Sequence, residues 1–215
     1  MYEGVHAYPD GASTVGRLAL TASEYGYDGV VVRSVEIRAA DPSQASGFVG
    51  NHREDATIVA VHGGDPVINR FAVEQPAVDV LAHPMAGDGE FNHVLAREAA
   101  ENGVRVEVSL KPVLHRDGGQ RVRDLRALRK LWEILDHYGT PYVVSTDPGS
   151  HLGLRAPREL QALGSVVGID ADDVAAGLAE WGRLAERNRE RSSASFVEPG
   201  VWTRDGREAN DNQES

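Results

Sequence analysis

Short apolar runs rich in β-branched residues recur along the chain, and each has turn residues beside it. They are VHAY near the N-terminus, GVVVRS (29–34), TIVAVHGG (57–64), VDVLAHP (78–84), VRVEVSL (104–110), YVVST (142–146) and SVVGI (165–169). Runs of this length are too short for helices, so each is predicted to form a strand. The ambiguous stretch 35–55 leaves room for an eighth strand.

Helices are predicted between these runs, where start and stop signals flank amphipathic patterns. They cover residues 13–25, 66–75, 90–102, 120–138 and 170–189, and Gly103 and Gly139 follow two of them as C-terminal stops. Strands that alternate with helices predict βα units and a parallel sheet. The number of strands predicts an α/β fold with a closed or distorted (β/α) TIM-like barrel rather than an open doubly wound sheet. No G-x-G-x-x-G motif or P-loop follows a strand, which lowers the case for nucleotide-binding folds.

The barrel is predicted to form one domain over residues 1–191. The segment 192–215 is polar, is punctuated by Gly and Pro and has no period, so it is predicted to be a disordered tail. No apolar run approaches the ~20 residues of a membrane span, and the N-terminus lacks the basic and apolar segments of a signal peptide. A cytoplasmic protein without membrane contact is therefore expected.

The charge of the chain is acidic and biased towards arginine. The formal net charge is −11, and only Lys111 and Lys130 among the 22 basic residues are lysines. Such a surface is typical of a salt-rich cytoplasm, where high ionic strength screens self-repulsion, and it indicates a halophilic source. The overall charge then reflects the solvent, so local charge must identify any nucleic-acid partner.

Six imidazole or carboxylate side chains fall in or just beyond predicted strands, where a barrel carries its functional groups. They are His6, His62, His83, Glu107, Asp147 and, in the loop that follows, His151. Because the chain has no cysteine, any zinc, manganese or iron site would have to use such ligands. The set is similar to that of the metallophosphoesterases of the polymerase-and-histidinol-phosphatase (PHP) superfamily, in which metals polarise a phosphoryl oxygen and generate hydroxide.

Two departures from the PHP pattern weaken this interpretation. The first strand carries His6-Ala7-Tyr8 in place of a His-x-His pair, and the late Asp-x-His pair is stretched to Asp147 and His151. The alternative is that these histidines are hydrogen-bonded beneath a rim, and it is preferred because spacing motifs are only hypotheses. No bound metal is expected, and the candidate ligands are interpreted as vestigial.

The segment 111–130 has seven basic residues and two acidic ones, so its net charge is positive whereas that of the whole chain is negative. On the helix predicted from residue 120, Arg123, Arg126 and Lys130 lie on a different face from the apolar side chains. The segment is either a solvated helix face or a phosphate-binding surface, for which bidentate arginines are suited.

A set of motifs in one order resembles the archaeal ribonuclease P protein component 3 family, the counterpart of the eukaryotic thirty-kilodalton subunit. The motifs are NHVLAR (92–97), VSLKPVL (108–114), VVST (143–146), RAPREL (155–160) and LGSVVG (163–168). The resemblance covers about residues 1–190 and is strongest over 78–168. Its specificity comes from the agreement in order and spacing of all the blocks together.

The resemblance implies a distorted (β/α) TIM-like barrel that is related to the PHP barrel and has no catalytic residue of its own. Ribonuclease P removes the 5′ leader of precursor tRNA; its RNA subunit performs the hydrolysis with Mg²⁺, and this chain would bind no cofactor. Expected partners are the ribonuclease P RNA, precursor tRNA through the holoenzyme, a small ferredoxin-like protein subunit and other ribonuclease P proteins. The competing hypothesis is a stand-alone metal-dependent PHP-type phosphoesterase.

The resemblance also implies positions that face RNA. Lys111 follows a strand at a basic position of the family, and Arg97, Arg155 and Arg158 match further basic positions. Together with the helix arginines, the candidate RNA-binding residues are Lys111, Arg155, Arg158, Arg97, Arg123, Arg126, His93 and Asn92. For Asn92 a helix N-cap and for His93 local packing remain open alternatives.

Overall fold

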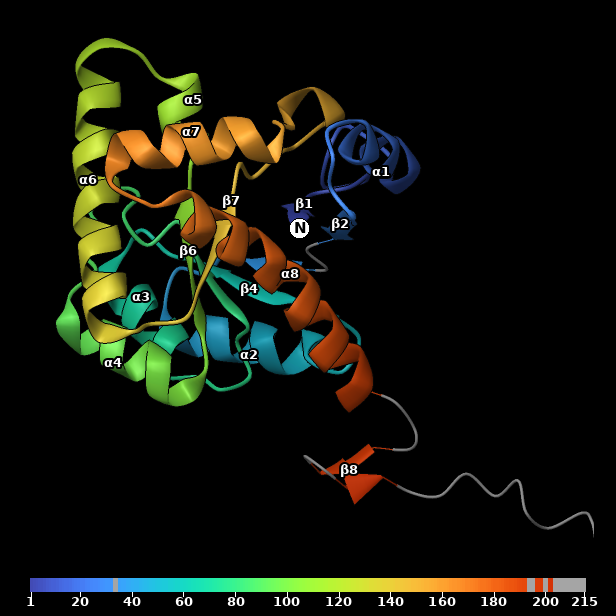
Figure 1. Ribbon diagram of the computed structural model, residues 1–215. Helices are drawn as coiled ribbons and strands as arrows, with labels where there is room; N and C mark the ends of the chain where they lie inside the picture. Colours follow the sequence, from blue (N-terminus) through green and yellow to red (C-terminus); the bar gives the residue numbers. More distant parts are fainter. Residues whose placement is uncertain (33–34, 193–195, 199–200, 203–215) are drawn as a thin grey trace, which may run out of the picture.

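The computed structural model describes residues 1–32, 35–192, 196–198 and 201–202, and strands alternate with helices through most of this chain (Figure 1). The first seven strands are β1 (Tyr2–Val5), β2 (Gly29–Val32), β3 (Val35–Ile37), β4 (Val59–His62), β5 (Val80–Ala82), β6 (Arg105–Ser109) and β7 (Tyr142–Ser145). The helices are α1 (Val15–Glu24), α2 (Pro42–His52), α3 (Pro66–Val73), α4 (His93–Asn102), α5 (Lys111–His115), α6 (Gly118–Tyr138), η1 (His151–Gly153), α7 (Pro157–Val167) and α8 (Ala171–Arg191).

These seven strands form two sheets, and all the paired strands in them are parallel, which confirms the predicted α/β class. Strands β3 to β7 form a five-stranded sheet in sequence order, and β1 pairs separately with β2. Within the described residues no hydrogen-bonded ladder joins β7 to β1 or β2 to β3. The predicted barrel is therefore distorted to the point that its strands do not close through hydrogen bonds.

Side chains bridge the gap between β1 and β7. Glu3 of β1 is fully buried, and its Oε1 accepts hydrogen bonds from Ser145 Oγ at 2.8 Å and from the Thr146 amide at 3.1 Å. Trp181 of α8 is also fully buried, and its indole donates to the Val144 carbonyl at 2.9 Å. Because a Cβ on Gly4 would lie 2.7 Å from the Trp181 ring, only glycine fits on β1 at this contact.

Helix α8 runs obliquely across the strands and ends at the pole where the strands begin (Figure 1). Its residues Trp181, Leu184 and Ala185 form a small core with inward residues of several strands, whereas the larger core joins the sheet to the other helices. At this pole the buried Asp79 carboxylate accepts hydrogen bonds from Arg53, Arg187, Asn188 and the Val59 amide, at 2.7–2.9 Å. This network ties α2, β4 and β5 to the last helix.

The strand predicted at 165–169 is wrong, whereas the eighth strand left open in the stretch 35–55 is present as β3. The run SVVGI (165–169), predicted as a strand, instead forms the C-terminal end of α7, and Gly168 stops the helix with φ 89°. A short apolar run has the same hydrophobic pattern in a strand and in a buried helix turn, so the pattern could not distinguish the two. The stretch 35–55 contains both β3 and helix α2, whose N-cap Asp41 accepts from the Gln44 amide at 2.9 Å.

The segment 192–215, predicted to be a disordered tail, is only partly described. Strands β8 (Phe196–Glu198) and β9 (Val201–Trp202) pair antiparallel, with Phe196 opposite Trp202. For the rest of the segment the prediction lies outside the described residues.

No helix in the described part of the chain combines the length and the apolar character needed to cross a membrane.

Candidate functional site

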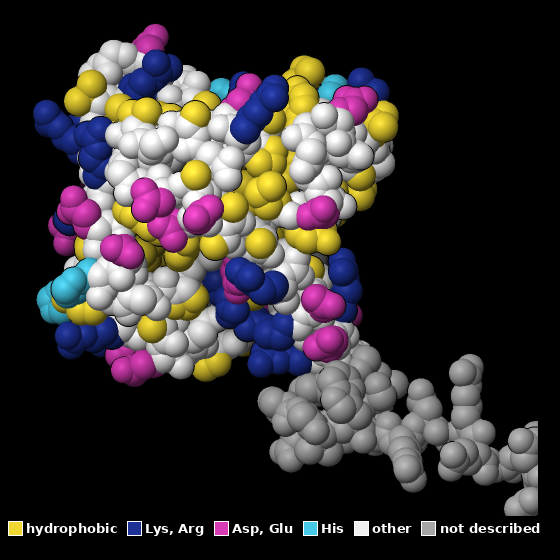
Figure 2. Space-filling view, viewed as in Figure 1, with side chains coloured by type: hydrophobic (Ala, Val, Ile, Leu, Met, Phe, Trp, Pro, Cys, Tyr) yellow, Lys and Arg dark blue, Asp and Glu magenta, His cyan; other side chains and the backbone are white. Residues whose placement is uncertain are grey.

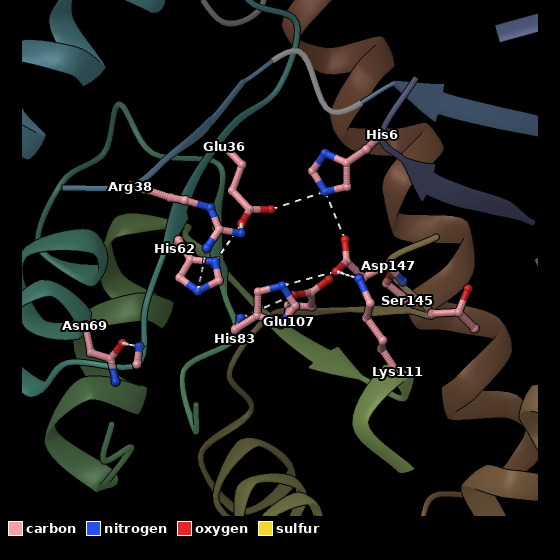
Figure 3. Close-up of polar contacts among 12 residues, drawn as sticks. His6, Glu36, Arg38, His62, Asn69, His83, Glu107, Lys111, Ser145 and Asp147 are labelled. Carbon is pink, nitrogen blue, oxygen red and sulfur yellow. Dashed lines mark hydrogen bonds and ion pairs between the residues drawn. The ribbon is translucent and has the colours of Figure 1, made fainter. Parts of the chain in front are cut away.

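A compact cluster of histidines and carboxylates lies where the carboxyl ends of the strands meet (Figure 3). We call the following residues the histidine cluster: His6 after β1, Glu36 on β3, His62 at the end of β4, His83 after β5, Glu107 on β6 and Asp147 after β7. Five of these were candidates from the sequence, and the parallel strands bring them to one end of the fold as expected.

Glu36, which the sequence did not single out, lies between two histidines. Its Oε1 is 2.6 Å from His62 Nδ1, and its Oε2 is 3.3 Å from His6 Nε2. The residue was missed because the stretch 35–55 was not resolved into a strand. The alternation Val35-Glu36-Ile37, with Ile37 buried, is the signal that could have placed a carboxylate on the site side of β3.

Asp147 links the other members of the cluster. Its Oδ1 lies 2.9 Å from His6 Nε2, and its Oδ2 lies 3.4 Å from His83 Nε2. Nδ1 of His83 is 3.6 Å from Glu107, a fully buried carboxylate that also accepts from the His83 amide at 3.2 Å. The cluster is therefore a continuous network in which carboxylates alternate with imidazoles.

Two basic side chains enter this network at the carboxylates. Lys111 Nζ lies 2.8 Å from Asp147 Oδ2, and Arg38 contacts Glu36 Oε1 at 3.0 Å. Arg38 also donates to His62 Nε2 at 3.2 Å, so a neutral His62 carries its proton on Nδ1 and donates it to Glu36. The cations that neutralise the acids of the cluster thus come from the chain itself.

The backbone is strained at two cluster residues. Among the described residues other than glycine, only His83 and Asp147 have positive φ, at 50° and 46°. Such conformations cost about 1–3 kcal/mol each and concentrate at functional sites. Asp147 is held by its amide, which donates to Ser145 Oγ at 2.6 Å, and Ser145 in turn donates to Glu3. The bridge between β1 and β7 therefore also positions the cluster carboxylate.

The protonation of His83 depends on its acidic neighbours. Burial lowers the pKa of His83, but the negative charge of Glu107, the hydrogen bond to Asp147 and the charge of Glu36 outweigh burial and raise it above the usual value. The acidic neighbours of His83 therefore stabilise its charged imidazolium form.

Replacement of His83 by asparagine is expected to remove a pH-dependent contribution to stability. Because the pKa of His83 is raised on folding above about 6.5, its contribution is fully present below that pH and is lost as the pH rises through the folded-state value. The difference in free energy of unfolding between wild type and His83→Asn should shrink from about pH 6.5 upward. Urea unfolding with chelator present measures this, and asparagine tolerates the positive φ. A difference that grows with pH would contradict the assignment.

Two subsets of the cluster have the composition of a divalent-metal site. Glu36, His62 and His83 form one, and His6, Glu36 and Asp147 form the other, each with one ligand atom per residue within 4.8 Å of the rest. His151, the remaining vestigial candidate, lies apart, since its Nδ1 pairs with Ser13 Oγ at 2.9 Å. The stretched Asp147 to His151 spacing thus takes this histidine out of the cluster.

The candidate RNA-binding residues fall in three places. Lys111 begins α5 beside the histidine cluster, and Arg123 and Arg126 are exposed on the first half of α6. Lys and Arg side chains gather over this half of α6, at the upper left of Figure 2. This is the surface that the sequence marked by its local reversal of charge.

A second pair, Arg155 and Arg158, lies around the start of α7. Arg155 donates to the carbonyls of Leu152 and Leu154, at 3.1 and 2.8 Å, so part of its hydrogen-bonding capacity holds η1. Arg158 is exposed on α7. Both residues remain accessible to a partner, although Arg155 also has a structural role.

The remaining candidates lie at the far end of α6. Arg97 stacks over the Tyr138 ring at 5.2 Å, and the His93 ring is 6.2 Å from the same tyrosine. Tyr138 ends α6, so these residues lie about 20 Å along the helix from Arg123. Asn92 is the N-cap of α4 and accepts from Val94 and Leu95 amides at 3.0 and 3.3 Å, which supports the structural interpretation of this residue.

Comparisons with known proteins agree on one family. The family model described as RNase P subunit p30 matches residues 31–193. A protein of Haloarcula marismortui named ribonuclease P protein component 3 is 55% identical over 95% of this chain and 97% of its own length. Proteins of the same name from Natronomonas pharaonis and Methanosarcina mazei are 53% and 33% identical over 94% of this chain and 94% of their own length.

A solved structure gives the same answer at the level of the fold. One chain of a structure described as archaeal ribonuclease P with mature tRNA is 27% identical and superposes with a TM-score of 0.72. The superposition covers 93% of this chain and 87% of the other chain. The similarity therefore extends over most of both chains.

Proposed function

Because this chain belongs to the RNase P subunit p30 family, we propose that it is a protein subunit of ribonuclease P, the ribonucleoprotein that generates the mature 5′ end of tRNA. The observation that carries this proposal is the 55% identity to a ribonuclease P protein component 3 over nearly the full length of both chains. Several of the similar proteins come from Haloarcula, Natronomonas and Halorubrum, in keeping with the acidic, arginine-rich composition.

The chain serves the ribonucleoprotein without performing the hydrolysis. In this proposal the RNA subunit cleaves with Mg²⁺, and the histidine cluster is a structural network that Lys111 and Arg38 neutralise. A divalent ion held by the cluster would polarise a phosphoryl oxygen, as in a stand-alone phosphoesterase. The residues fit such an ion in composition, but binding it would require displacing these two basic side chains.

Metal analysis separates these alternatives. We expect the purified protein to contain substoichiometric zinc, manganese and iron and to show no phosphomonoesterase turnover. We expect Lys111→Ala to raise its affinity for zinc or manganese, because the substitution removes the ammonium from Asp147. Stoichiometric metal in the wild type, with turnover that is lost in His83→Asn, would instead establish the phosphoesterase.

The partners follow from the same proposal. The chain would contact the ribonuclease P RNA and, through the holoenzyme, precursor tRNA; the similar chain of known structure belongs to a ribonuclease P that holds mature tRNA. A small ferredoxin-like protein subunit is the proposed protein partner, and the cytoplasm is the proposed location.

RNA contact is proposed at the end of the molecule that carries the histidine cluster. Lys111, Arg123 and Arg126 form one group and Arg155 and Arg158 another, and such contacts to phosphates position RNA without reading its bases. The Lys111 side chain is 44% exposed, so its ammonium can contact a phosphate on the side that faces away from Asp147.

The double variant Lys111→Ala/Arg155→Ala is expected to weaken RNA-dependent activity about tenfold and to lower the slope of affinity against salt by about two. The measurement is 5′-leader cleavage by holoenzyme reconstituted from the RNA and its proteins, over a salt titration. The matched control is Arg70→Ala/Arg189→Ala, which removes the same charge from exposed helix faces elsewhere. Wild-type cleavage across the titration would refute the proposed contact surface.

A further inference from the structure

A cavity of about 330 Å³ opens beside the histidine cluster and is not explained by the role proposed so far. Its walls come from the loop after β5, from β6 and α5, and from the first half of α6. The apolar part of the wall consists of Pro84, Met85, Pro112, Val113, Leu128 and Leu131. A cavity of this size and character is at the small end of the range that holds organic ligands.

Two polar atoms in this wall lack partners. Ser109 Oγ and Asp124 Oδ2 are buried, and neither has a hydrogen-bond partner among the described residues. The other Asp124 oxygen accepts from Arg116 at 2.9 Å, so the carboxylate is held in place with one oxygen unsatisfied. Buried polar atoms are normally paired with protein, water or a ligand, because leaving them unpaired costs free energy. The wall is therefore prepared for a group that donates hydrogen bonds.

The polar lining is positive at the exposed side of the cavity. Arg116 and Arg123 line the cavity from α6 and the residues before it; the Arg116 side chain is 54% exposed and Arg123 is also exposed. Glu107, at the histidine cluster, is fully buried and also lines the cavity. The charge thus changes from positive at the exposed side to negative inside, with apolar walls between.

We propose that this cavity binds a single unpaired ribonucleotide whose base carries an amino group. The phosphate would lie on Arg116 and Arg123, the planar base between the apolar walls, and the amino group against Asp124 and Ser109. Guanine, adenine and cytosine carry such a group, whereas uracil does not. The inference deepens the proposed function, on which it rests, because single-stranded RNA is recognised through bases that are splayed out and hydrogen-bonded on their edges.

Nucleotide titration of the isolated full-length protein tests the proposal. The probes are the 5′-monophosphates of guanosine, cytidine and uridine, ribose 5-phosphate and inorganic phosphate, with binding followed by NMR or calorimetry at fixed salt. We expect the guanosine and cytidine nucleotides to bind at least ten times more tightly than uridine monophosphate or the two baseless phosphates. Equal affinity for inorganic phosphate would overturn the proposal, because the site would then recognise an anion alone.

Three variants test the position of the site. Ala127→Phe fills the cavity from α6 without changing charge and should reduce nucleotide affinity more than tenfold. Ser109→Ala removes no internal hydrogen bond, so it should keep the fold and reduce the preference over uridine monophosphate. Arg123→Ala should weaken nucleotide binding about fivefold, whereas Arg129→Ala, on the same helix but outside the cavity, should leave it unchanged. Equal losses in the two arginine variants would overturn the site assignment.

Leader cleavage by the reconstituted holoenzyme separates the two proposals. A wild-type protein that supports cleavage but binds none of the nucleotides refutes the nucleotide site and leaves the subunit proposal intact. A protein that binds nucleotides selectively but does not stimulate cleavage with its partners refutes the subunit proposal instead.

Discussion

Asp79→Ala is expected to lower the free energy of unfolding by about 3–5 kcal/mol, because it removes the acid from a buried charged network. The carboxylate is 2% exposed and accepts hydrogen bonds from two arginines, an asparagine and a backbone amide. Burial and the charge of Arg105 already lower the pKa of Arg187, and Asp79 opposes this effect. Without Asp79, Arg53 and Arg187 would be left half-buried with no shared counter-charge.

For a chain of this length such a loss corresponds to a fall in melting temperature of about 10 °C. Thermal and urea unfolding at fixed salt measure it, and the surface variant Asp55→Ala should change stability by no more than about 0.5 kcal/mol. The network lies at the pole opposite the histidine cluster, so folded Asp79→Ala should still support leader cleavage. A variant as stable as wild type would show that the network does not hold α8 to the strands.

Trp181→Ala is expected to cost about 3–5 kcal/mol, since it empties a large, fully buried site between β1 and β7. The indole also donates to the Val144 carbonyl, so Trp181→Phe, which keeps most of the volume, should cost only about 1–2 kcal/mol. Equal losses in the two variants would show that the hydrogen bond, rather than packing, accounts for the effect.

The variant Trp181→Ala should also affect function. The gap that Trp181 fills is the one that Glu3 crosses to Ser145, and Ser145 holds the Asp147 amide. Loss of the indole should therefore weaken the contact between β1 and β7 and disorder the end of β7 that lies next to the histidine cluster. Under conditions where the variant remains folded, we expect holoenzyme reconstituted with Trp181→Ala to cleave more slowly than holoenzyme with Asp79→Ala. Equal cleavage rates would indicate that the β1–β7 bridge does not support the RNA-facing end.

The parallel α/β architecture could be predicted from the sequence because its signals are local. Gly103 and Gly139 do end α4 and α6, with φ of 67° and 59°, and Asn92 caps α4. Those features depend on the conformation of a few adjacent residues, which sequence reports directly. The prediction of a strand at 165–169 was wrong because the local pattern of this run fits both a strand and a helix end.

The composition of the site was also partly visible in the sequence. Histidines and acids just beyond strand ends predicted a cluster at one end of the fold, and His6, His62, His83 and Asp147 do meet there. Glu36 was not among the candidates because β3, which carries it, is only three residues long and could not be recognised as a strand from the sequence around it. His151 was assigned to the same group by proximity in sequence, but its loop carries it to Ser13.

Short-range patterns in the sequence were enough to predict the alternation of strands and helices over most of the chain, the family motifs and most of the residue types that gather at the carboxyl ends of the strands. The folded structure was needed to show that Lys111 neutralises Asp147, 36 residues away, and that Asp124 and Ser109 line one cavity. It also decided that Trp181 and Glu3 replace a missing ladder between β1 and β7. These contacts join side chains from distant elements, and their partners are selected by packing geometry, which no local pattern encodes.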